Sequence, residues 1–315
     1  MERNISVLVP AYNEADSLPE LYKQVRAGLD TCFANGQADD YEIWFVNDGS
    51  ADETESVIKD LIKTDDKVHL ISFRKNFGKS PALNAGFHHV SGDIVFTMDA
   101  DLQDDPKEFT RFLEKIDEGY DLVVGWKKNR MDNAEKRLPS KLFNRVTSSF
   151  SGVKLHDHDC GFKCFRIEVV KSIELYGELH RYIPVLAYRK GFRITEITVE
   201  HHKRKYGSSK YGVERYMRGL FDSMTTLFLL KYSDRPMYLF GRLGVFSGGI
   251  GFIICLYLTI LWFCGQGIGS RPLLTLGVLL LIVGIQFISM GFLGNMLVEF
   301  TRRDRYSEDH VKEII

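Results

Sequence analysis

Two long uncharged stretches near the C-terminus constrain the fold of this chain more than any other feature. No charged residue occurs from Leu243 to Ser270, and none occurs from Pro272 to Val298. Each stretch is about 27 residues long, roughly 40 Å of α-helix, whereas the hydrocarbon core of a bilayer is roughly 30 Å thick. The sequence predicts two membrane-spanning helices, at about 243–265 and 273–298, in a hairpin covering 238–300. The alternative is a helical hairpin buried in a soluble protein.

The charges that flank these stretches predict their orientation. Basic residues flank the two stretches at their outer ends: Lys231, Arg235 and Arg242 around the start of the first, and Arg302, Arg303 and Arg305 after the second. Between the stretches only Arg271 is charged. Because cytoplasmic flanks carry an excess of Lys and Arg, we expect both chain ends and the N-terminal domain in the cytoplasm. In the first stretch, Gly244-x-x-x-Gly248 fits close helix packing, either between subunits of a homo-oligomer or within one chain.

The rest of the chain has the composition of a globular protein. It is 315 residues long, 26% charged and 44% hydrophobic, with a formal net charge of -1, so no basic excess suggests nucleic-acid binding. The five cysteines form no C-x-x-C pair, which favours free thiols over a disulfide framework. The apolar run near the N-terminus, Ile5 to Val9, is too short for a signal peptide.

Short β-rich runs alternate with amphipathic segments in the N-terminal part. Strands are expected at 5–10, 41–48, 68–73, 93–99 and 121–126. Near-continuous apolar strands that alternate with helices predict an α/β fold with a mainly parallel, Rossmann-like sheet covered on both faces. Ligands bind such sheets beyond the carboxyl ends of the strands. Three expected strands end in polar clusters, "PAYNE", "NDGS" and "DADLQ", which predicts a site there.

A different pattern covers residues 212–235. Apolar residues from Val213 to Phe228 recur at helical spacing, which predicts an amphipathic helix. Directly before two membrane spans, this helix is expected to lie along the bilayer surface or to pack on the soluble domain.

The polar strand ends contain candidate ligands for a metal ion and a nucleotide. Asp99 and Asp101 are two residues apart, so they point to the same side of an extended chain, and Gln103 continues the series. Hard oxygen ligands of this kind suit Mg²⁺ or Mn²⁺ bridging a diphosphate. Asp48 ends another strand and is a candidate for binding a base or ribose, and Lys79 is a candidate nucleotide contact.

Taken together, these motifs resemble the family 2 glycosyltransferases of the GT-A fold, and more narrowly the polyprenyl-phosphate glycosyltransferases such as bactoprenol glucosyltransferases and dolichol-phosphate mannose synthases. The resemblance covers essentially the whole chain and rests on "VLVPAYNEADSL", "VNDGSADET", "FRKNFGKSPALNAG", "MDADLQDDP", "CGFKCF" and "RKYGSSKY", in that order. It implies a GT-A domain at 1–211, the amphipathic helix at 212–235, two spans, and a cytoplasmic tail at 301–315.

The resemblance also implies roles for particular residues. The nucleotide-sugar would be bound by Pro10, Ala11, Tyr12, Glu14, Asp48, Lys79, Asp99, Ala100 and Asp101. The metal would be held by Asp99, Asp101 and Gln103, and the catalytic residues would be Asp99, Asp101, Lys127 and Arg204. The acceptor phosphate would be bound by Lys127, Arg130, Arg137, Arg204, Ser209 and Lys210. Lys127 stands where the family often has arginine, and Asp105 replaces a frequent proline.

The implied reaction is metal-dependent, inverting transfer of a sugar from a nucleotide-sugar to polyprenyl phosphate at the bilayer, with UDP-glucose as the expected donor. GDP-mannose is the alternative donor. A hydroxyl acceptor would instead need a carboxylate base, for which Asp157 and Asp159 are the candidates. A further alternative is a non-catalytic nucleotide-sugar-binding partner of a lipid flippase. The Q-x-x-R-W motif of processive polysaccharide synthases is absent.

Overall fold

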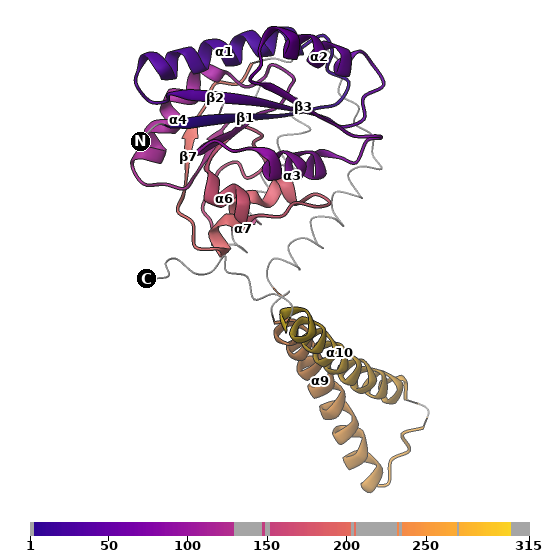
Figure 1. The fold of residues 1–315 in the computed structure, drawn as a ribbon. Helices are drawn as coiled ribbons and strands as arrows, with labels where there is room; N and C mark the ends of the chain where they lie inside the picture. The colour runs from indigo at the N-terminus through magenta and orange to yellow at the C-terminus, as the bar shows by residue number, and fades with distance from the viewer. Residues whose placement is uncertain are drawn as a thin grey trace. The chain divides into compact units, whose positions relative to one another are not determined.

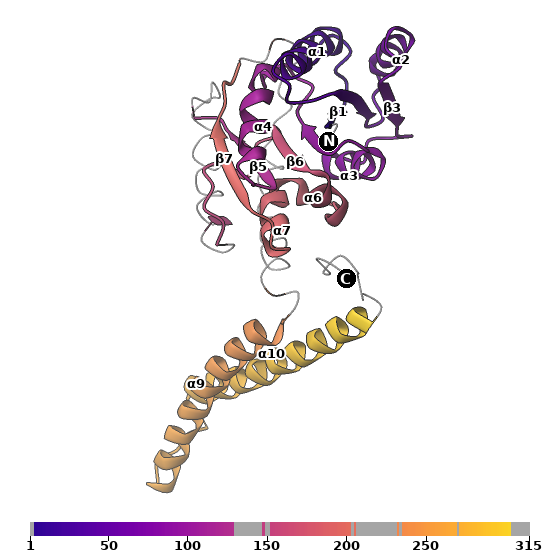
Figure 2. The same cartoon turned by 60° about the vertical axis from the view of Figure 1, so that its left-hand side comes forward.

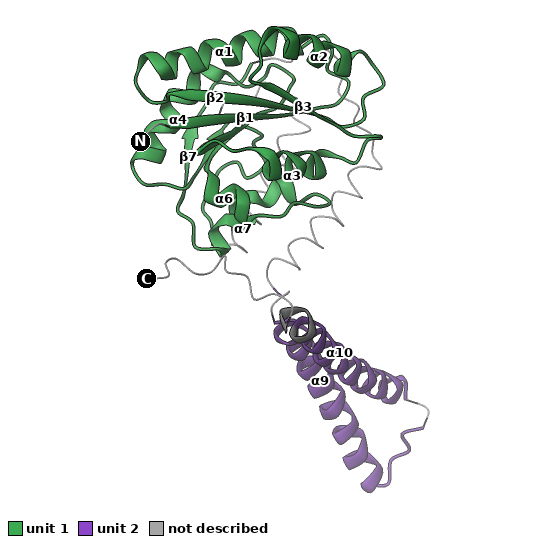
Figure 3. Cartoon of the chain, viewed as in Figure 1, with its two compact units in different colours: residues 1–226 green, residues 227–315 purple. Residues whose placement is uncertain are grey.

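The computed structural model describes residues 3–128, 147–148, 152–202, 205, 232, 235–269 and 271–303. The chain divides into two compact units, Met1–Thr226 and Leu227–Ile315 (Figure 3).

The first unit is built around a seven-stranded sheet in the order β3-β2-β1-β4-β6-β5-β7. Its strands are β1 (Asn4–Ala11), β2 (Asp40–Asn47), β3 (Val68–Ser72), β4 (Ile94–Thr97), β5 (Leu122–Trp126), β6 (Lys163–Arg166) and β7 (Ile194–Thr198). All neighbouring strands are parallel except β6, which runs antiparallel to both β4 and β5. The predicted mainly parallel sheet of the GT-A type is confirmed.

Helices cover both faces of this sheet (Figures 1 and 2). Figure 1 shows α1 (Leu18–Ala34) and α2 (Thr54–Thr64) on one side, with α3 (Lys79–His89), α6 (Ile167–Ser172) and α7 (Ile183–Arg189) on the other. The helix α4 (Phe109–Asp117), which follows the short 3-10 helix η1 (Pro106–Glu108), packs against α1. A second 3-10 helix, η2 (Leu179–Tyr182), precedes α7.

The sequence explains why α1 forms and which face it buries. Pro19 lies in its first turn, where the missing N–H costs no helical hydrogen bond. Its buried residues recur every three or four positions and form one apolar stripe: Leu18, Leu21, Val25, Leu29 and Cys32.

An aromatic cluster fixes the region around the end of β4. Phe96 of β4 lies 4.2 Å from Phe109, and Phe112 lies 4.6 Å from Phe162, measured between ring centroids. All four side chains are fully buried, which stabilises the fold by about 1.5–3 kcal/mol for each ring. The cluster joins β4, the start of α4 and the segment that leads into β6, so these three parts hold one another in place.

The second unit contains a pair of long apolar helices, α9 (Met237–Phe263) and α10 (Pro272–Arg303). Both are long and apolar enough to cross a bilayer, and only 17% and 11% of their most apolar windows are buried. Helices of a soluble core would be mostly buried, so the alternative of a buried hairpin does not fit. The two predicted helices are confirmed, and their exposed apolar surfaces indicate a membrane protein.

Glycines allow α9 and α10 to approach closely. A Cβ atom on Gly251 would lie 2.7 Å from the carbonyl oxygen of Gly277, and one on Gly244 would lie 2.7 Å from that of Gly284. The Ser247 hydroxyl also donates to the Leu280 carbonyl at 3.0 Å. Gly244 therefore packs against α10 of the same chain. This is one of the two alternatives that the Gly244-x-x-x-Gly248 motif left open.

The five expected strands are present, but β6 and β7 were not predicted. β6 has four residues and begins with a buried lysine, Lys163, so it lacks the apolar run of a central strand. β7, "ITEIT", is short and half polar. The amphipathic helix predicted at 212–235 lies outside the described residues except for Tyr232 and Arg235.

Candidate active site

The carboxyl ends of β1, β2 and β4 lie side by side because these strands are parallel neighbours in register. Ala11 at the end of β1 pairs with Asn47 at the end of β2, and the Asp48 N–H donates to the Ala11 carbonyl at 2.9 Å. β4 ends at Thr97, opposite Leu8, so Met98 and Asp99 continue alongside the last residues of β1. The three polar clusters predicted at strand ends therefore meet at one edge of the sheet.

The loop after β1 is tied to the loop after β2. Asn13, at φ 54°, donates its N–H to the Ser50 hydroxyl at 3.0 Å and accepts from the Ala51 N–H at 2.8 Å. The Glu14 N–H donates to the Thr54 hydroxyl at 2.9 Å. These bonds fix the backbone around Tyr12, which is 44% exposed and available to a ligand.

Asp48 is buried and binds backbone rather than standing free. Its two carboxylate oxygens accept the N–H groups of Phe77 and Gly78, at 2.7 and 2.9 Å. The neighbouring Gly49 has φ 65°, and a Cβ there would lie 2.2 Å from the backbone of Lys75. Asp48 thus holds the segment before α3, which places Lys79 at the first turn of that helix.

Lys79 reaches across the sheet edge and forms an ion pair with Asp99. Asp99 also lies against Gly161, where a Cβ atom would be 2.5 Å from its Oδ2. Burial opposes the ionised form of Asp99, but the positive charges of Lys79 and Lys127 outweigh it and hold the pKa of this carboxyl well below its usual range. Asp99 is therefore an anion whose position is set from two sides.

The geometry of the metal motif differs from its expected form. β4 ends before Asp99, residues 99–103 form a turn, and Leu102 has φ 61°. The premise that Asp99 and Asp101 lie in an extended chain is wrong, because the chain turns at residues 100–101, between and at these carboxylates. Within this turn Asp101 accepts the Gln103 N–H at 3.3 Å.

Segment 199–202, which follows β7, runs beside this turn. The His202 N–H donates to the Gln103 carbonyl at 3.0 Å, and the Gln103 side-chain amide donates to the His202 carbonyl at 3.3 Å. Asp104 and His201 form an antiparallel bridge. Because the side-chain nitrogen of Gln103 makes this hydrogen bond to His202, the side-chain oxygen of Gln103 remains as a ligand for a cation. The chemistry of the donor set, two carboxylates and an amide oxygen within one turn, fits Mg²⁺ or Mn²⁺.

A second group of possible metal ligands lies next to this turn. Asp105, Glu200 and His202 have ligand atoms within 4.8 Å of one another. Asp105 and His202 contact at 3.3 Å, and Glu200 and His202 are exposed. This group was not predicted from the sequence.

Lys127 follows β5 and forms an ion pair with Asp104, with Nζ 2.6 Å from Oδ1. The two side chains are only 9% and 0% exposed. Burial lowers the pKa of Lys127, but the charge of Asp104 outweighs this and raises it above its usual value. Lys127 is therefore the cation that compensates this buried carboxylate.

Further polar residues at this edge were missed from the sequence. The Ser80 hydroxyl lies 2.9 Å from Nδ1 of His180, and Arg181 contacts Asp159 at 3.2 Å and Glu178 at 3.0 Å. Burial, then the charge on Lys79, lowers the pKa of His180 to about 3, so this imidazole is neutral. No local pattern distinguishes "ELHRY" from an ordinary helix start; only the fold brings Arg181 here.

Five predicted site residues, Arg130, Arg137, Arg204, Ser209 and Lys210, lie outside the described residues. The structure places the others around the same sheet edge: Pro10, Ala11, Tyr12, Glu14, Asp48, Lys79, Asp99, Ala100, Asp101, Gln103 and Lys127.

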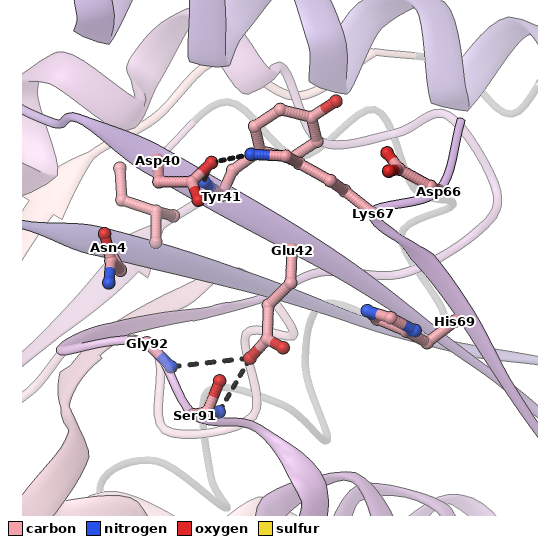
Figure 4. Close-up of a pocket in the computed structure, with 10 residues that line it drawn as sticks. Asn4, Asp40, Tyr41, Glu42, Asp66, Lys67, His69, Ser91 and Gly92 are labelled. Carbon is pink, nitrogen blue, oxygen red and sulfur yellow. Dashed lines mark hydrogen bonds and ion pairs between the residues drawn. The ribbon is translucent and has the colours of Figure 1, made fainter.

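A polar pocket lies at the opposite edge of the sheet, where β1 and β2 begin (Figure 4). It is lined by Asn4, Asp40, Glu42 and Lys67, among others. Three of its charged groups already have partners: Lys67 pairs with Asp40, and Glu42 accepts the Ser91 N–H at 2.6 Å. We therefore do not place the active site there.

The fold and the polar sheet edge define an α/β protein of the nucleotide-sugar-binding GT-A class. The family model for glycosyl transferase family 2 matches residues 6–174, and the chain belongs to this family. It is accordingly a glycosyltransferase.

Curated relatives extend the similarity over nearly the whole chain. A dodecaprenyl-phosphate galacturonate synthase of Rhizobium johnstonii is 35% identical, covering 98% of this chain and 91% of the relative. An undecaprenyl-phosphate 4-deoxy-4-formamido-L-arabinose transferase of an Enterobacter species is 34% identical, covering 93% and 88%. The resemblance to polyprenyl-phosphate glycosyltransferases is confirmed.

Solved structures share the fold. Glucosyl-3-phosphoglycerate synthase of Mycobacterium tuberculosis, in complex with Mn²⁺ and UDP-glucose, superposes with a TM-score of 0.53 at 18% identity, covering 73% of this chain and 79% of the other. At this identity the similarity establishes the fold alone.

Proposed function

We propose that this protein transfers a sugar from a nucleotide-sugar to a polyprenyl phosphate at the membrane, with inversion at the anomeric carbon. The observation that carries this proposal is the anionic turn at the end of β4, held by Lys79 and Gly161, in a chain that also has two exposed apolar helices. Relatives with 34–35% identity over more than nine-tenths of the chain are named for transfer to polyprenyl phosphates.

The donor would lie across the carboxyl ends of β1, β2 and β4. The base and ribose would contact the loops around Tyr12 and Asp48, and the diphosphate would face Asp99 and Asp101. A divalent cation held by Asp99, Asp101 and Gln103 would neutralise the charge that develops on the leaving diphosphate. Lys79 holds Asp99 ionised and in place for this role.

The acceptor needs little base catalysis. A phosphate monoester loses its second proton near pH 6, so the attacking oxygen is already anionic at neutral pH. The site instead needs cations around the incoming phosphate. Arg181, which is half-buried and pairs with Asp159 and Glu178, joins the candidates from sequence as a cation near this site. Lys127 is buried against Asp104, so we assign it to holding the 103–105 segment.

A hydroxyl acceptor fits the structure less well. It would require an accessible carboxylate base. Of the two candidates, Asp159 is engaged in an ion pair with Arg181 at 3.2 Å, and Asp157 is only 2% exposed.

The proposal also extends to the identity of the donor sugar. We retain UDP-glucose as the expected donor and GDP-mannose as the alternative. The names of the relatives add galacturonate and 4-deoxy-4-formamido-L-arabinose as candidate sugars. We place both chain ends and the catalytic domain on the cytoplasmic side, from the basic residues that flank the spans.

The test uses purified full-length protein, undecaprenyl phosphate in vesicles and radiolabelled nucleotide-sugars supplied one at a time. We expect a lipid-linked product from one donor with Mg²⁺ or Mn²⁺, none in EDTA, and recovery when metal is returned. Full activity in chelator would contradict the metal, and labelling of a hydroxyl acceptor but not the phosphate would contradict the acceptor. Nucleotide-sugar binding without turnover would favour a binding partner over an enzyme.

A further inference from the structure

An amide side chain lies exposed at the middle of α10. Gln286 is the fifteenth of the 27 residues of the apolar span Pro272–Val298. Its side chain is exposed, and no hydrogen bond joins it to another residue in the described part of the chain. An amide at this depth in hydrocarbon lacks water as a partner, so its position is unfavourable unless another protein group satisfies it.

Gln286 points away from α9. The side of α10 that packs on α9 carries buried glycines seven residues apart, Gly277, Gly284 and Gly291. Gln286 comes two residues after Gly284, which is about 200° further around the helix. No rearrangement within the hairpin brings its amide to a partner on α9 while these glycine contacts remain.

Gln286 belongs to a regular stripe along the outer side of α10. Residues spaced alternately by four and three positions are all exposed, and we call them the Gln286 seam: Thr275, Leu279, Ile282, Gln286, Ser289, Leu293 and Met296. This spacing is the heptad repeat by which two helices pack along one another. Ser289 places a second polar group one position along the seam.

The outer residues of α9 offer no comparable feature at this depth. Gly244 and Gly248 of α9 lie against Gly284, and the hydroxyl at this level, that of Ser247, donates to the Leu280 carbonyl inside the hairpin at 3.0 Å. This polar group is already satisfied.

We propose that α10 self-associates, with the Gln286 seam of one chain packed in parallel against that of a second copy. Copies of one membrane protein insert with the same orientation, so each Gln286 meets its counterpart at the same depth. An amide both donates and accepts, so two of them satisfy each other across a twofold axis. A different membrane protein would need its own polar group at this level. The inference rests on the helices crossing a bilayer and not on the proposed reaction.

The experiment compares two cysteine variants of the full chain, each with Cys255 and Cys264 replaced by alanine. Ile282→Cys lies in the seam; Leu276→Cys lies six residues earlier, about 120° around the helix. Their native side chains are 49% and 45% exposed, so they are matched. Each protein is reconstituted at low density into phosphatidylethanolamine–phosphatidylglycerol vesicles and oxidised with copper phenanthroline.

We expect a disulfide-linked dimer from Ile282→Cys and little from Leu276→Cys. Adding Gln286→Leu should weaken dimerisation of Ile282→Cys about threefold to thirtyfold, whereas Gln286→Asn should preserve it. Equal cross-linking of both cysteines, or none from either, would overturn the proposal. So would cross-linking of Ile282→Cys in native membranes to a different protein instead of to itself. Turnover measured on the same vesicles distinguishes failure of this proposal from failure of the proposed function.

Discussion

At the scale of single residues, carboxylates that look alike in sequence have unequal roles. Asp101 lies in the turn that would hold the cation, whereas Asp159 is engaged by Arg181. We predict that Asp101→Asn lowers turnover about 10²-fold or more, because the leaving diphosphate loses its counter-charge. Asp159→Asn should lower turnover by less than about tenfold.

The measurement is initial-rate transfer by purified variants, with thermal unfolding as the control for folding. Near-normal turnover of Asp101→Asn with metal present would remove Asp101 from the mechanism. A greater loss from Asp159→Asn than from Asp101→Asn would favour a hydroxyl acceptor activated by a carboxylate base.

The buried pair of Lys127 and Asp104 gives a prediction about stability. Replacing Lys127 with methionine leaves the carboxylate of Asp104 buried without its cation, which should lower the free energy of unfolding by about 3–5 kcal/mol. The double variant Lys127→Met/Asp104→Leu should recover most of this loss. Denaturant unfolding of the soluble unit or full chain measures both, and a single variant as stable as the parent would contradict the role assigned to the pair.

At the scale of elements, the approach of α9 to α10 depends on particular glycines. Gly251→Val should separate the helices, because its Cβ would lie 2.7 Å from the Gly277 carbonyl, and this overpacking costs about 1–3 kcal/mol. Gly249→Val is the matched control, since no atom lies within 4 Å of a Cβ at that position. Thermal unfolding in detergent should be lowered by the first substitution only; equal effects would mean that helix propensity, not packing, is being measured.

Elements also show what the sequence could and could not predict. The strands β1 to β5 were predictable because each is an apolar run, and their polar ends identified the site. The antiparallel strand β6 was not, because burial of Lys163 depends on its bond to the Cys160 carbonyl, which only the fold creates. The turn after β4 was predicted as extended chain because no residue type in "DADLQ" indicates the positive φ of Leu102. Arg181 was missed for a similar reason: it reaches the site through the packing of η2 on α3.

At the scale of the whole molecule, two histidines, the buried His158 and the half-buried His180, make stability depend on pH. Burial lowers the pKa of His158 to about 4 and that of His180 to about 3, below the value of about 6.5 expected in the unfolded chain. The unfolded state therefore binds more protons below pH 6.5, so the stabilisation is complete above this pH and is lost as pH falls towards 4.

We predict that stability falls between pH 6.5 and 4 by up to about 1.4 kcal/mol per pH unit for each histidine. His180→Gln, which keeps a polar group near Ser80, should flatten this dependence while lowering stability at neutral pH only modestly. Unfolding followed across this pH range measures the slope. An unchanged slope in both His180→Gln and His158→Gln would mean that neither imidazole is held neutral.

The proposed reaction requires the turn after β4 to hold a divalent cation against the diphosphate of the donor. The most direct measurement is an anomalous difference map from crystals grown with Mn²⁺ and a nucleoside diphosphate. We predict a manganese peak bounded by Asp101, Asp99 and the Gln103 side-chain oxygen, in contact with the diphosphate. A peak only at Asp105, Glu200 and His202, or a diphosphate bound at another edge of the sheet, would contradict the account.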